Sequence, residues 1–263
     1  MTYKRKVINR LASIEKEAGK WVSVITVFSI VVIWELVCRS GMVSELFLPA
    51  PTSILITAWD MLISGELIVN GEASLLRIIM GFLLGSIAGI LIGLVLGFSK
   101  LADAMGNPVI YALYPIPKLA LLPLIILWLG IGEVSKISII ALGVFFPVVI
   151  NTYSGVRNLD PLLIKVAVSF KATKYRIIRK VILPGAMPVI FAGLKLAAGT
   201  ALLLLVAAEM IAAKEGIGAM ILHYGDLMLT TKLMVGILTL SLVGVIFNHF
   251  LQWVERRMIP WKN

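Results

Sequence analysis

Long apolar runs dominate this chain and restrict its fold more than any other feature. They occupy approximately residues 21–38, 75–98, 107–129, 135–156, 186–212 and 233–254. A helix needs about 20 apolar residues to cross the roughly 30 Å hydrocarbon core of a bilayer. The runs therefore predict an all-α membrane protein with about six transmembrane helices. Only 14% of the residues are charged, whereas soluble domains have about 25%, so the composition argues against a soluble protein.

The third run, 107–129, is the least regular because Pro115, Pro117 and Pro123 interrupt it. Proline is tolerated in a membrane helix where neighbouring helices or water satisfy the carbonyl groups that it leaves free. We therefore expect a broken or kinked helix in this run.

The distribution of lysine and arginine predicts the orientation of the helices, because cytoplasmic loops carry an excess of these residues. Of the 24 basic residues, 17 fall in the two tails and in the loops after the second and fourth runs. The opposite loops hold four: Arg39, Lys136, Lys214 and Lys232. Both termini and the loop 157–184 are therefore predicted to be cytoplasmic. Residues 1–20 would be a cytoplasmic tail, and 21–263 one transmembrane domain.

The first apolar run has no small-residue cleavage site, so we expect an uncleaved anchor helix rather than a signal peptide. The outer loop that follows, 39–72, contains a helical pattern that begins at Pro51. Ile54 and Ala58 share one face of this pattern, with Trp59 beside them. The short helix either lies in the outer membrane interface with Trp59 as its anchor or is an ordinary surface helix.

The cytoplasmic loop 157–184 has a helix-turn-helix pattern. Asp160 followed by Pro161 is typical of an N-cap and a first helical position. Leu162, Val166 and Phe170 then recur every fourth residue and form one apolar stripe. A second helix is predicted to begin at Thr173 and to end at the prolines 184 and 188, which lead into the fifth span.

Between Lys165 and Lys180 this loop carries six basic residues and no acidic one. Binding to anionic lipid would account for these charges. Nucleic-acid binding is disfavoured, in spite of the net charge of +10, because the flanking spans hold the segment at the bilayer. Docking to a soluble protein would also account for the apolar stripe, since a helix that enters a groove uses such anchors. Lipid binding and protein docking remain as alternatives.

The loop resembles the EAA loop of ABC-importer permeases, E-A-A-x3-G-x9-I-x-L-P. Aligned on the final L-P, its fixed positions fall on Lys165, Val166, Ala167, Lys171, Val181, Leu183 and Pro184. Lys171 stands where the family has glycine. A residue other than glycine in the left-handed conformation costs roughly 1 kcal/mol or more, so the sequence leaves open whether the turn is kept.

Other stretches resemble the nitrate/sulfonate/taurine-type permease subfamily. They are LPAPTSI (48–54), SLLRIIMGFLLGSIAGILIGLVLGFS (74–99), YPIPKLALLPLIILWLGIG (114–132) and LPGAMPVIFAGLKLAAGTALLLLVAAEM (183–210). The resemblance extends from about residue 30 to 255. It implies the permease subunit of a type I ABC importer, located in the bacterial cytoplasmic (inner) membrane.

The resemblance also implies partners and an arrangement. Two copies, expected to be identical, would form a path through the membrane lipid. Each would bind a cytoplasmic ATPase that carries ATP and Mg²⁺, and an extracytoplasmic binding protein would deliver the solute. Nitrate, bicarbonate, sulfonates, taurine and vitamin precursors are the solutes of such relatives. The implied ATPase-docking segment comprises Lys165, Val166, Ala167, Val168, Ser169, Phe170 and Lys171.

Ionisable residues in membrane spans are functional candidates by default. Glu209 ends the fifth run and would line an outer gate or lie in interfacial water. Arg77 would line the path or snorkel to the surface. Lys118 in the broken third run and Lys195 deep in the fifth are candidates for a cationic path that suits an anionic solute. Glu35 in the first run is expected to be a structural ion-pair partner.

Glycines recur every four residues along the second run. Such a stripe allows another helix to approach closely, either within the subunit or across a dimer. The packing residues are Gly81, Gly85, Gly89 and Gly93, with Gly97 next in the series.

Other functions are disfavoured by missing motifs. The chain has no G-x-x-x-x-G-K-[ST] phosphate loop, so we expect it to bind no ATP or cofactor and not to be an enzyme. It has neither H-E-x-x-H nor C-x-x-C, so no metal is expected. A secondary carrier driven by an ion gradient is the alternative from another class, but it would predict internal repeats and more buried acids. A non-transporting scaffold would give the broken third run no purpose.

Overall fold

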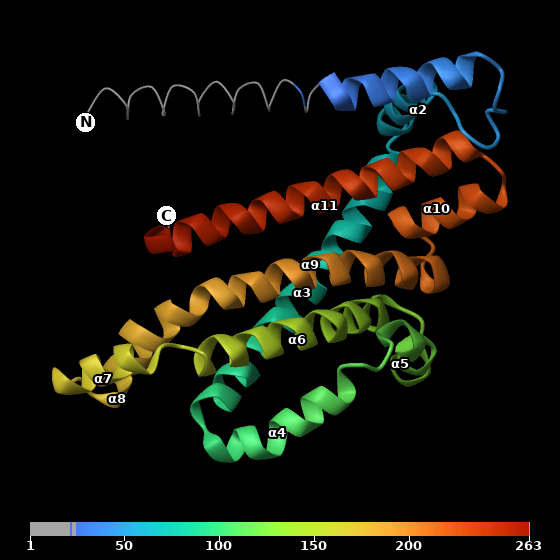
Figure 1. Ribbon diagram of the computed structural model, residues 1–263. Helices are drawn as coiled ribbons and strands as arrows, with labels where there is room; N and C mark the ends of the chain where they lie inside the picture. Colours follow the sequence, from blue (N-terminus) through green and yellow to red (C-terminus); the bar gives the residue numbers. More distant parts are fainter. Residues whose placement is uncertain (1–21, 23–24, 263) are drawn as a thin grey trace, which may run out of the picture.

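The computed structural model describes residue 22 and residues 25–262, so the predicted tail 1–20 lies outside the described residues. This part of the chain is helical and contains no strand (Figure 1). Residues 25–39 form a first helix. The elements that follow are α2 (Pro51–Ile63), α3 (Glu66–Phe98), α4 (Lys100–Leu113), η1 (Lys118–Leu121), α5 (Leu122–Leu129), α6 (Glu133–Arg157), α7 (Pro161–Ser169), α8 (Lys174–Ile177), η2 (Ile178–Ile182), α9 (Leu183–Ala212), α10 (Ile217–Asp226), α11 (Thr230–Met258) and η3 (Pro260–Lys262).

Four helices among the described residues are long and apolar enough to cross a membrane. They are α3, α6, the continuous stretch Lys174–Ala212 that ends in α9, and α11. A bent pair, Lys100–Leu113 with Lys118–Leu129, passes the same test and makes a fifth. The all-α membrane fold is confirmed. The sixth predicted run, 21–38, falls partly on residues outside the described part of the chain.

The third predicted span is broken, as its prolines indicated. Its two halves meet at an angle of 88°. Pro117 lies in the break and is the N-cap of η1. Proline removes a backbone donor and its ring clashes with the preceding turn, so the helix stops before it and restarts after it.

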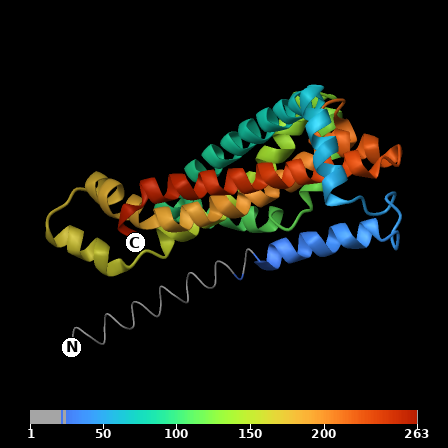
Figure 2. The same ribbon diagram turned by 90° about the horizontal axis from the view of Figure 1, so that it is seen from above.

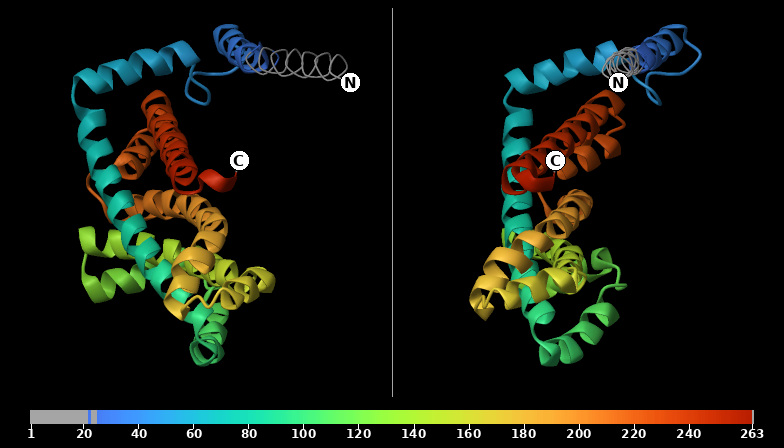
Figure 3. Two further views of the ribbon diagram at one scale, coloured as in Figure 1. Left: turned by 90° about the vertical axis from the view of Figure 1, so that its left-hand side faces the viewer. Right: turned by 60° about the vertical axis from the view of Figure 1, so that its left-hand side comes forward.

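The core of the bundle is built around α6, which packs against α3 and against α9. Ile140, Val144 and Val148 on α6 have no exposed surface, and neither have Ala197 and Ala201 on α9. Glycines allow α6 and α9 to pack closely, because a methyl group at Gly143 on α6 would lie 2.1 Å from Leu204 and one at Gly193 on α9 would lie 2.5 Å from Cβ of Asn151. Figures 2 and 3 show that α3 passes from the end of the bundle that carries α2 to the end that carries α4.

The glycine stripe of α3 packs against α6 within the same subunit. A methyl group at Gly85 would lie 2.4 Å from the carbonyl oxygen of Ala141 and 2.8 Å from Cβ of Val144. Methyl groups at the other glycines of the stripe would lie 2.6–2.9 Å from atoms of α6. The pairs are Gly81 with Ile140, Gly89 with Val148, Gly93 with Thr152 and Gly97 with Val156. Only hydrogen fits at these positions.

Two alanine substitutions on α3 are expected to have opposite effects. Gly85→Ala would force α3 away from α6 and is expected to destabilise the protein by about 1–3 kcal/mol. Gly71→Ala is the matched control, because a methyl group there has no atom within 4 Å and alanine favours the helix by up to about 1 kcal/mol. Thermal unfolding of the detergent-solubilised protein measures both. Equal melting temperatures for the two variants would contradict the close packing of this face.

The start of α3 differs from the prediction. The helix begins at Glu66, not at residue 75, directly after Gly65 with its φ of +82°. The helix extends beyond the apolar run towards its N-terminus, where it includes the polar residues Glu66, Asn70 and Glu72. The predicted outer loop is therefore shorter, and it contains the expected short helix α2. One face of α2 is buried at Ile54, whereas Trp59 is exposed.

The prediction that Pro184 and Pro188 end the second helix of the cytoplasmic loop is wrong. The helix continues without a break from Lys174 to Ala212. A π-helical turn, η2, ends two residues before Pro184. Its wider spacing changes the position of the carbonyl groups with which the proline ring would clash, so the helix bends instead of ending.

The helix at residues 25–39 has little contact with the bundle, and its residues 25–33 are exposed. In Figure 2 it lies to one side of the other helices. Glu35 joins it to α2: its carboxylate accepts from Nε of Arg39 at 2.5 Å and from the Thr52 backbone and hydroxyl at 3.1 and 2.7 Å. Glu35 is thus a structural ion-pair partner, as predicted.

Candidate functional site

The helices α7 and α8 project from one end of the bundle, opposite the end that carries α10 (Figures 1 and 2). The predicted N-cap of α7 is confirmed, because the Asp160 carboxylate accepts from the Leu162 backbone N–H at 2.8 Å. The side chains of Leu162, Val166 and Phe170 are 61%, 46% and 82% exposed. An apolar stripe on a well-formed helix is thus left uncovered in the single chain.

The turn at the end of α7 forms although Lys171 stands where the family has glycine. Its φ is +53°, the left-handed conformation for which the EAA pattern has glycine. The Lys171 N–H donates to the Val168 carbonyl at 2.8 Å, and the Ala172 N–H to the Ala167 carbonyl at 3.1 Å. This pair of bonds is the Schellman motif, which satisfies the free carbonyls at a helix end.

Replacing Lys171 by glycine is expected to stabilise this turn. Glycine adopts the left-handed conformation without the penalty of roughly 1 kcal/mol. Amide hydrogen exchange of α7 should slow by about fivefold, since 1.4 kcal/mol corresponds to a factor of ten. Lys165→Gly is the matched control, because glycine inside α7 loses helix propensity and should accelerate the same exchange. Faster exchange in Lys171→Gly would contradict this account.

At the other end of the bundle, Glu209 lies in a buried network. It has no exposed surface and accepts from Nη1 of Arg77 at 2.6 Å, from Ser74 Oγ at 2.8 and 2.9 Å, and from the Gly218 N–H at 2.8 Å. The Arg77 side chain is 4% exposed. Arg77 therefore does not snorkel, and Glu209 does not lie in interfacial water.

The same arginine connects α3 with α6, with α9 and with the loop before α10. Its Nε and Nη2 bind both carboxylate oxygens of Glu133, at 2.6 and 2.8 Å, and its Nη1 also donates to the Glu215 carbonyl at 2.7 Å. Lys136, assigned from the sequence to an outer loop, is buried in α6 and binds Glu133 at 2.7 Å. The network thus joins the first half of α3 to the start of α6, the end of α9 and the start of α10.

Sequence reasoning missed Glu133, Ser74 and Asn70. Asn70 accepts from the Gly216 N–H at 2.8 Å, and Ser74 from the Ile217 N–H at 2.8 Å. The only local signal was the spacing of three between Glu133 and Lys136, which is typical of a helical ion pair. The contacts of Ser74 and Asn70 with the α9–α10 region and that of Glu133 with Arg77 join residues more than 50 positions apart. No group of three or more metal-binding side chains occurs among the described residues.

Outside the spans, Tyr224 on α10 contacts the start of α3. Its phenol donates to Glu66 and accepts from Nζ of Lys232 at 3.3 Å. Burial, together with the hydrogen bond to Glu66, raises the pKa of the Tyr224 phenol. The group therefore stays protonated and can donate over the physiological range.

Lys195 and Lys118, the two predicted path lysines, have different surroundings. Lys195 on α9 forms an ion pair with Glu255 on α11. Lys118, at the break between α4 and η1, donates to the Tyr114 carbonyl. Its ammonium lies 4.5 Å from the Phe146 ring centroid and 4.9 Å from that of Tyr114. It has no ion pair within the part of the chain that the structure describes.

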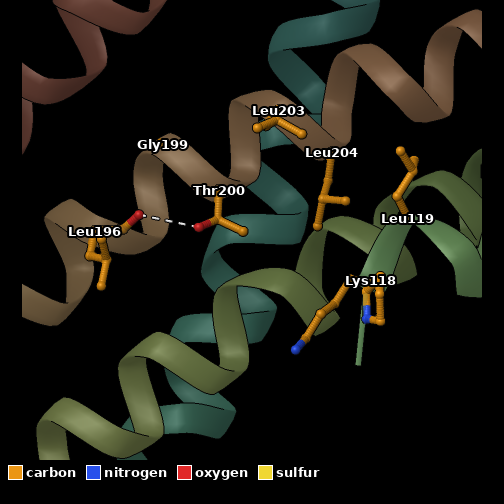
Figure 4. A pocket seen from close by; sticks show the side chains of 8 residues that line it. Lys118, Leu119, Leu196, Gly199, Thr200, Leu203 and Leu204 are labelled. Atoms are coloured by element: carbon orange, nitrogen blue, oxygen red, sulfur yellow. Dashed lines mark hydrogen bonds between the residues drawn. The ribbon is translucent and has the colours of Figure 1, made fainter. Parts of the chain in front are cut away.

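Lys118 borders a pocket between the broken span and α9, shown in Figure 4. The pocket has a volume of about 480 Å³. Four of its eight lining residues are leucines, and Gly199 leaves room because a methyl group there would have no atom within 4 Å. The lining residues are Pro117, Lys118, Leu119, Leu196, Gly199, Thr200, Leu203 and Leu204.

Comparison with known proteins identifies the fold and the family. The model of the family of binding-protein-dependent transport system inner membrane components matches residues 81–260. The chain belongs to this family. It is a multi-pass inner-membrane permease of an ABC transporter, and the resemblance seen in the sequence is confirmed.

Individual family members agree with this assignment. The putative aliphatic sulfonates transport permease SsuC of Bacillus subtilis is 41% identical over 89% of this chain and 85% of its own length. The taurine transport system permease TauC of Escherichia coli is 34% identical over 91% of this chain and 89% of its own length. The inward-facing MetNI methionine ABC transporter has a chain of the same fold, with a TM-score of 0.60 and 19% identity over 76% of this chain and 98% of that chain.

Proposed function

We propose that this permease, as a homodimer, forms the path by which a small organic sulfonate enters the cell. A separate cytoplasmic ATPase, which binds ATP and Mg²⁺, drives the import. A separate extracytoplasmic binding protein delivers the solute. The chain itself binds neither ATP nor a cofactor and catalyses no reaction.

The exposed stripe of α7 is the observation that carries this proposal. Leu162, Val166 and Phe170 present apolar surface on a helix that is capped at both ends and stands clear of the bundle. A membrane-anchoring helix would need no such defined end. A rigid helix that enters a groove of a soluble partner needs a defined end, since its anchor residues must keep a fixed register in the groove. The docking segment 165–171 would therefore transmit the movement of the ATPase.

The proposed orientation places α7 and both termini in the cytoplasm. The excess of basic residues in the tails and in the loop 157–184 supports it. The course of α11 supports it as well, because this helix runs from the α10 end towards the α7 end (Figure 1). The network of Arg77 and Glu209 would then lie at the outer surface, where the binding protein approaches.

The sulfonate class is supported by the relatives and by Lys118, which forms no ion pair with the described residues. The two relatives described above are transporters of aliphatic sulfonates and of taurine by name. A permanently anionic solute is complementary to the ammonium of Lys118. The charges of Arg77 and Lys195 are instead neutralised by carboxylates, so their predicted role in the path stays a prediction.

Uptake in proteoliposomes tests the proposal. The permease is reconstituted with the ATPase and the binding protein of the same organism, and uptake of radiolabelled ethanesulfonate is measured. Uptake is expected with ATP and to be absent with a non-hydrolysable ATP analogue. Uptake without ATP that follows an ion gradient would replace the proposal by a secondary carrier. ATP-driven uptake of a vitamin precursor, but not of any sulfonate, would overturn the substrate class alone.

A further inference from the structure

The pocket beside Lys118 lies at the middle of a membrane span. Its α9 residues, from Leu196 to Leu204, occupy the central part of the helix Leu183–Ala212. Its other wall is the irregular backbone at the break of the third span. In transport proteins, broken helices near the bilayer centre are typical of solute sites, because irregular backbone is tolerated there only where it lines a cavity or is buried in protein.

The wall of the pocket is almost wholly apolar, and the charge beside it, on Lys118, has no counterion among the described residues. Carboxylates neutralise Arg77, Lys136 and Lys195 within the described residues, but none lies within ion-pair distance of Lys118. Two aromatic rings and one carbonyl oxygen hold its ammonium instead. A cation among apolar groups in a membrane is costly without an anionic partner. An incoming anion would supply that partner.

The rest of the lining is suited to a hydrocarbon chain. Leu196, Leu203 and Leu204 come from α9 and Leu119 from η1, and Gly199 leaves space between them. Figure 4 shows Leu196 and Thr200 on the side of α9 that faces the Lys118 segment. The Thr200 hydroxyl lies 3.4 Å from the Leu196 carbonyl, a long hydrogen bond that an anion can replace. No lining residue is acidic, so an ammonium group on the solute would find no partner.

From this arrangement we infer that the pocket is a head-and-tail site for unsubstituted alkanesulfonates. The sulfonate pairs with Lys118, and the alkyl chain lies against the leucines of α9 and η1. The site selects against zwitterionic aminosulfonates such as taurine, since it offers nothing to the amino group. This inference rests on the proposed import of sulfonates and adds a selection step within the permease, separate from that of the binding protein.

Binding to the assembled permease–ATPase complex, without the binding protein, tests the inference. The complex is placed in phosphatidylcholine nanodiscs and titrated calorimetrically with hexanesulfonate, taurine or hexylammonium. Hexanesulfonate is expected to bind at least tenfold more tightly than taurine, and hexylammonium not to bind. Equal affinities for the three compounds would overturn the inference.

Three variants locate the site. Lys118→Met is expected to weaken hexanesulfonate binding by tenfold or more, whereas Lys118→Arg should stay within about threefold because it keeps the charge. Gly199→Leu fills the pocket from the other wall and should weaken binding without removing any charge. Co-purified ATPase verifies that each variant assembles. Unchanged binding in Gly199→Leu or in Lys118→Met would place the sulfonate elsewhere and overturn the inference.

Two further outcomes separate the possible explanations. If phosphatidylglycerol in the nanodiscs abolishes hexanesulfonate binding, the pocket is a lipid site and the inference is wrong. If the complete transporter imports ethanesulfonate with ATP while Lys118→Met imports it at the native rate, the proposed function stands and only this site falls. If the complete transporter imports no sulfonate, the proposed function fails and the inference fails with it.

Discussion

Glu209→Ala is expected to lower the melting temperature of the detergent-solubilised permease by on the order of 10 °C. The substitution leaves the buried Arg77 guanidinium without its buried partner and removes the acceptor of Ser74 and of the Gly218 N–H. Removing one member of a buried ion pair costs about 3–5 kcal/mol. For a chain of this size, each kilocalorie corresponds to about 2–4 °C. Size-exclusion chromatography of heated samples gives the midpoint.

Glu215→Ala is the matched control for this prediction. It removes the same kind of side chain from the loop between α9 and α10, but Glu215 contributes only its carbonyl oxygen to Arg77. Its effect should stay within about 0.5 kcal/mol. Replacing both charges, Arg77→Met with Glu209→Met, should be milder than Glu209→Ala, because no buried charge is left alone. A Glu209→Ala protein that melts within 2 °C of the native one would show that the network carries no stability.

Phe170→Asp is expected to abolish binding of the ATPase while leaving the permease folded. Phe170 is 82% exposed at the end of α7, so the single chain does not need it for packing. An aromatic anchor at the centre of an interface contributes about 2 kcal/mol or more, which is roughly thirtyfold in affinity. Aspartate adds the cost of burying a charge. Co-purification with a tagged ATPase, followed by ATP-driven uptake, measures both consequences.

Phe47→Asp makes the same chemical change at the opposite end of the bundle. Phe47 is 78% exposed and lies next to Leu46, whose carbonyl accepts from the Thr230 hydroxyl at the start of α11. This variant should retain the ATPase fully. Loss of the ATPase in both variants would indicate general misfolding in detergent, and retention in both would show that α7 is not the docking element.

The sequence by itself determined the features that depend on local chemistry. Apolar runs of sufficient length predict membrane helices because the bilayer leaves the backbone no other way to satisfy its hydrogen bonds. Pro115 and Pro117 predicted the broken span, and Asp160 the start of α7, because both effects act within one helical turn. The glycine spacing predicted a close helix contact. Where a helix continues through polar residues, as α3 does at Glu66, this reasoning placed the start of the helix wrongly.

Only the tertiary structure decided which residues meet. The sequence also allowed solvated positions for Arg77 and Glu209, and their burial with Glu133 depends on contacts between residues more than 50 positions apart along the chain. The different surroundings of Lys118 and Lys195 also depend on packing. Both are lysines in apolar spans, but of the two only Lys195 has a carboxylate facing it from another helix. Local sequence fixes a helix and its faces. Which side chain pairs with which, and whether a charge is neutralised, follows from tertiary packing, and the sequence alone does not show that packing.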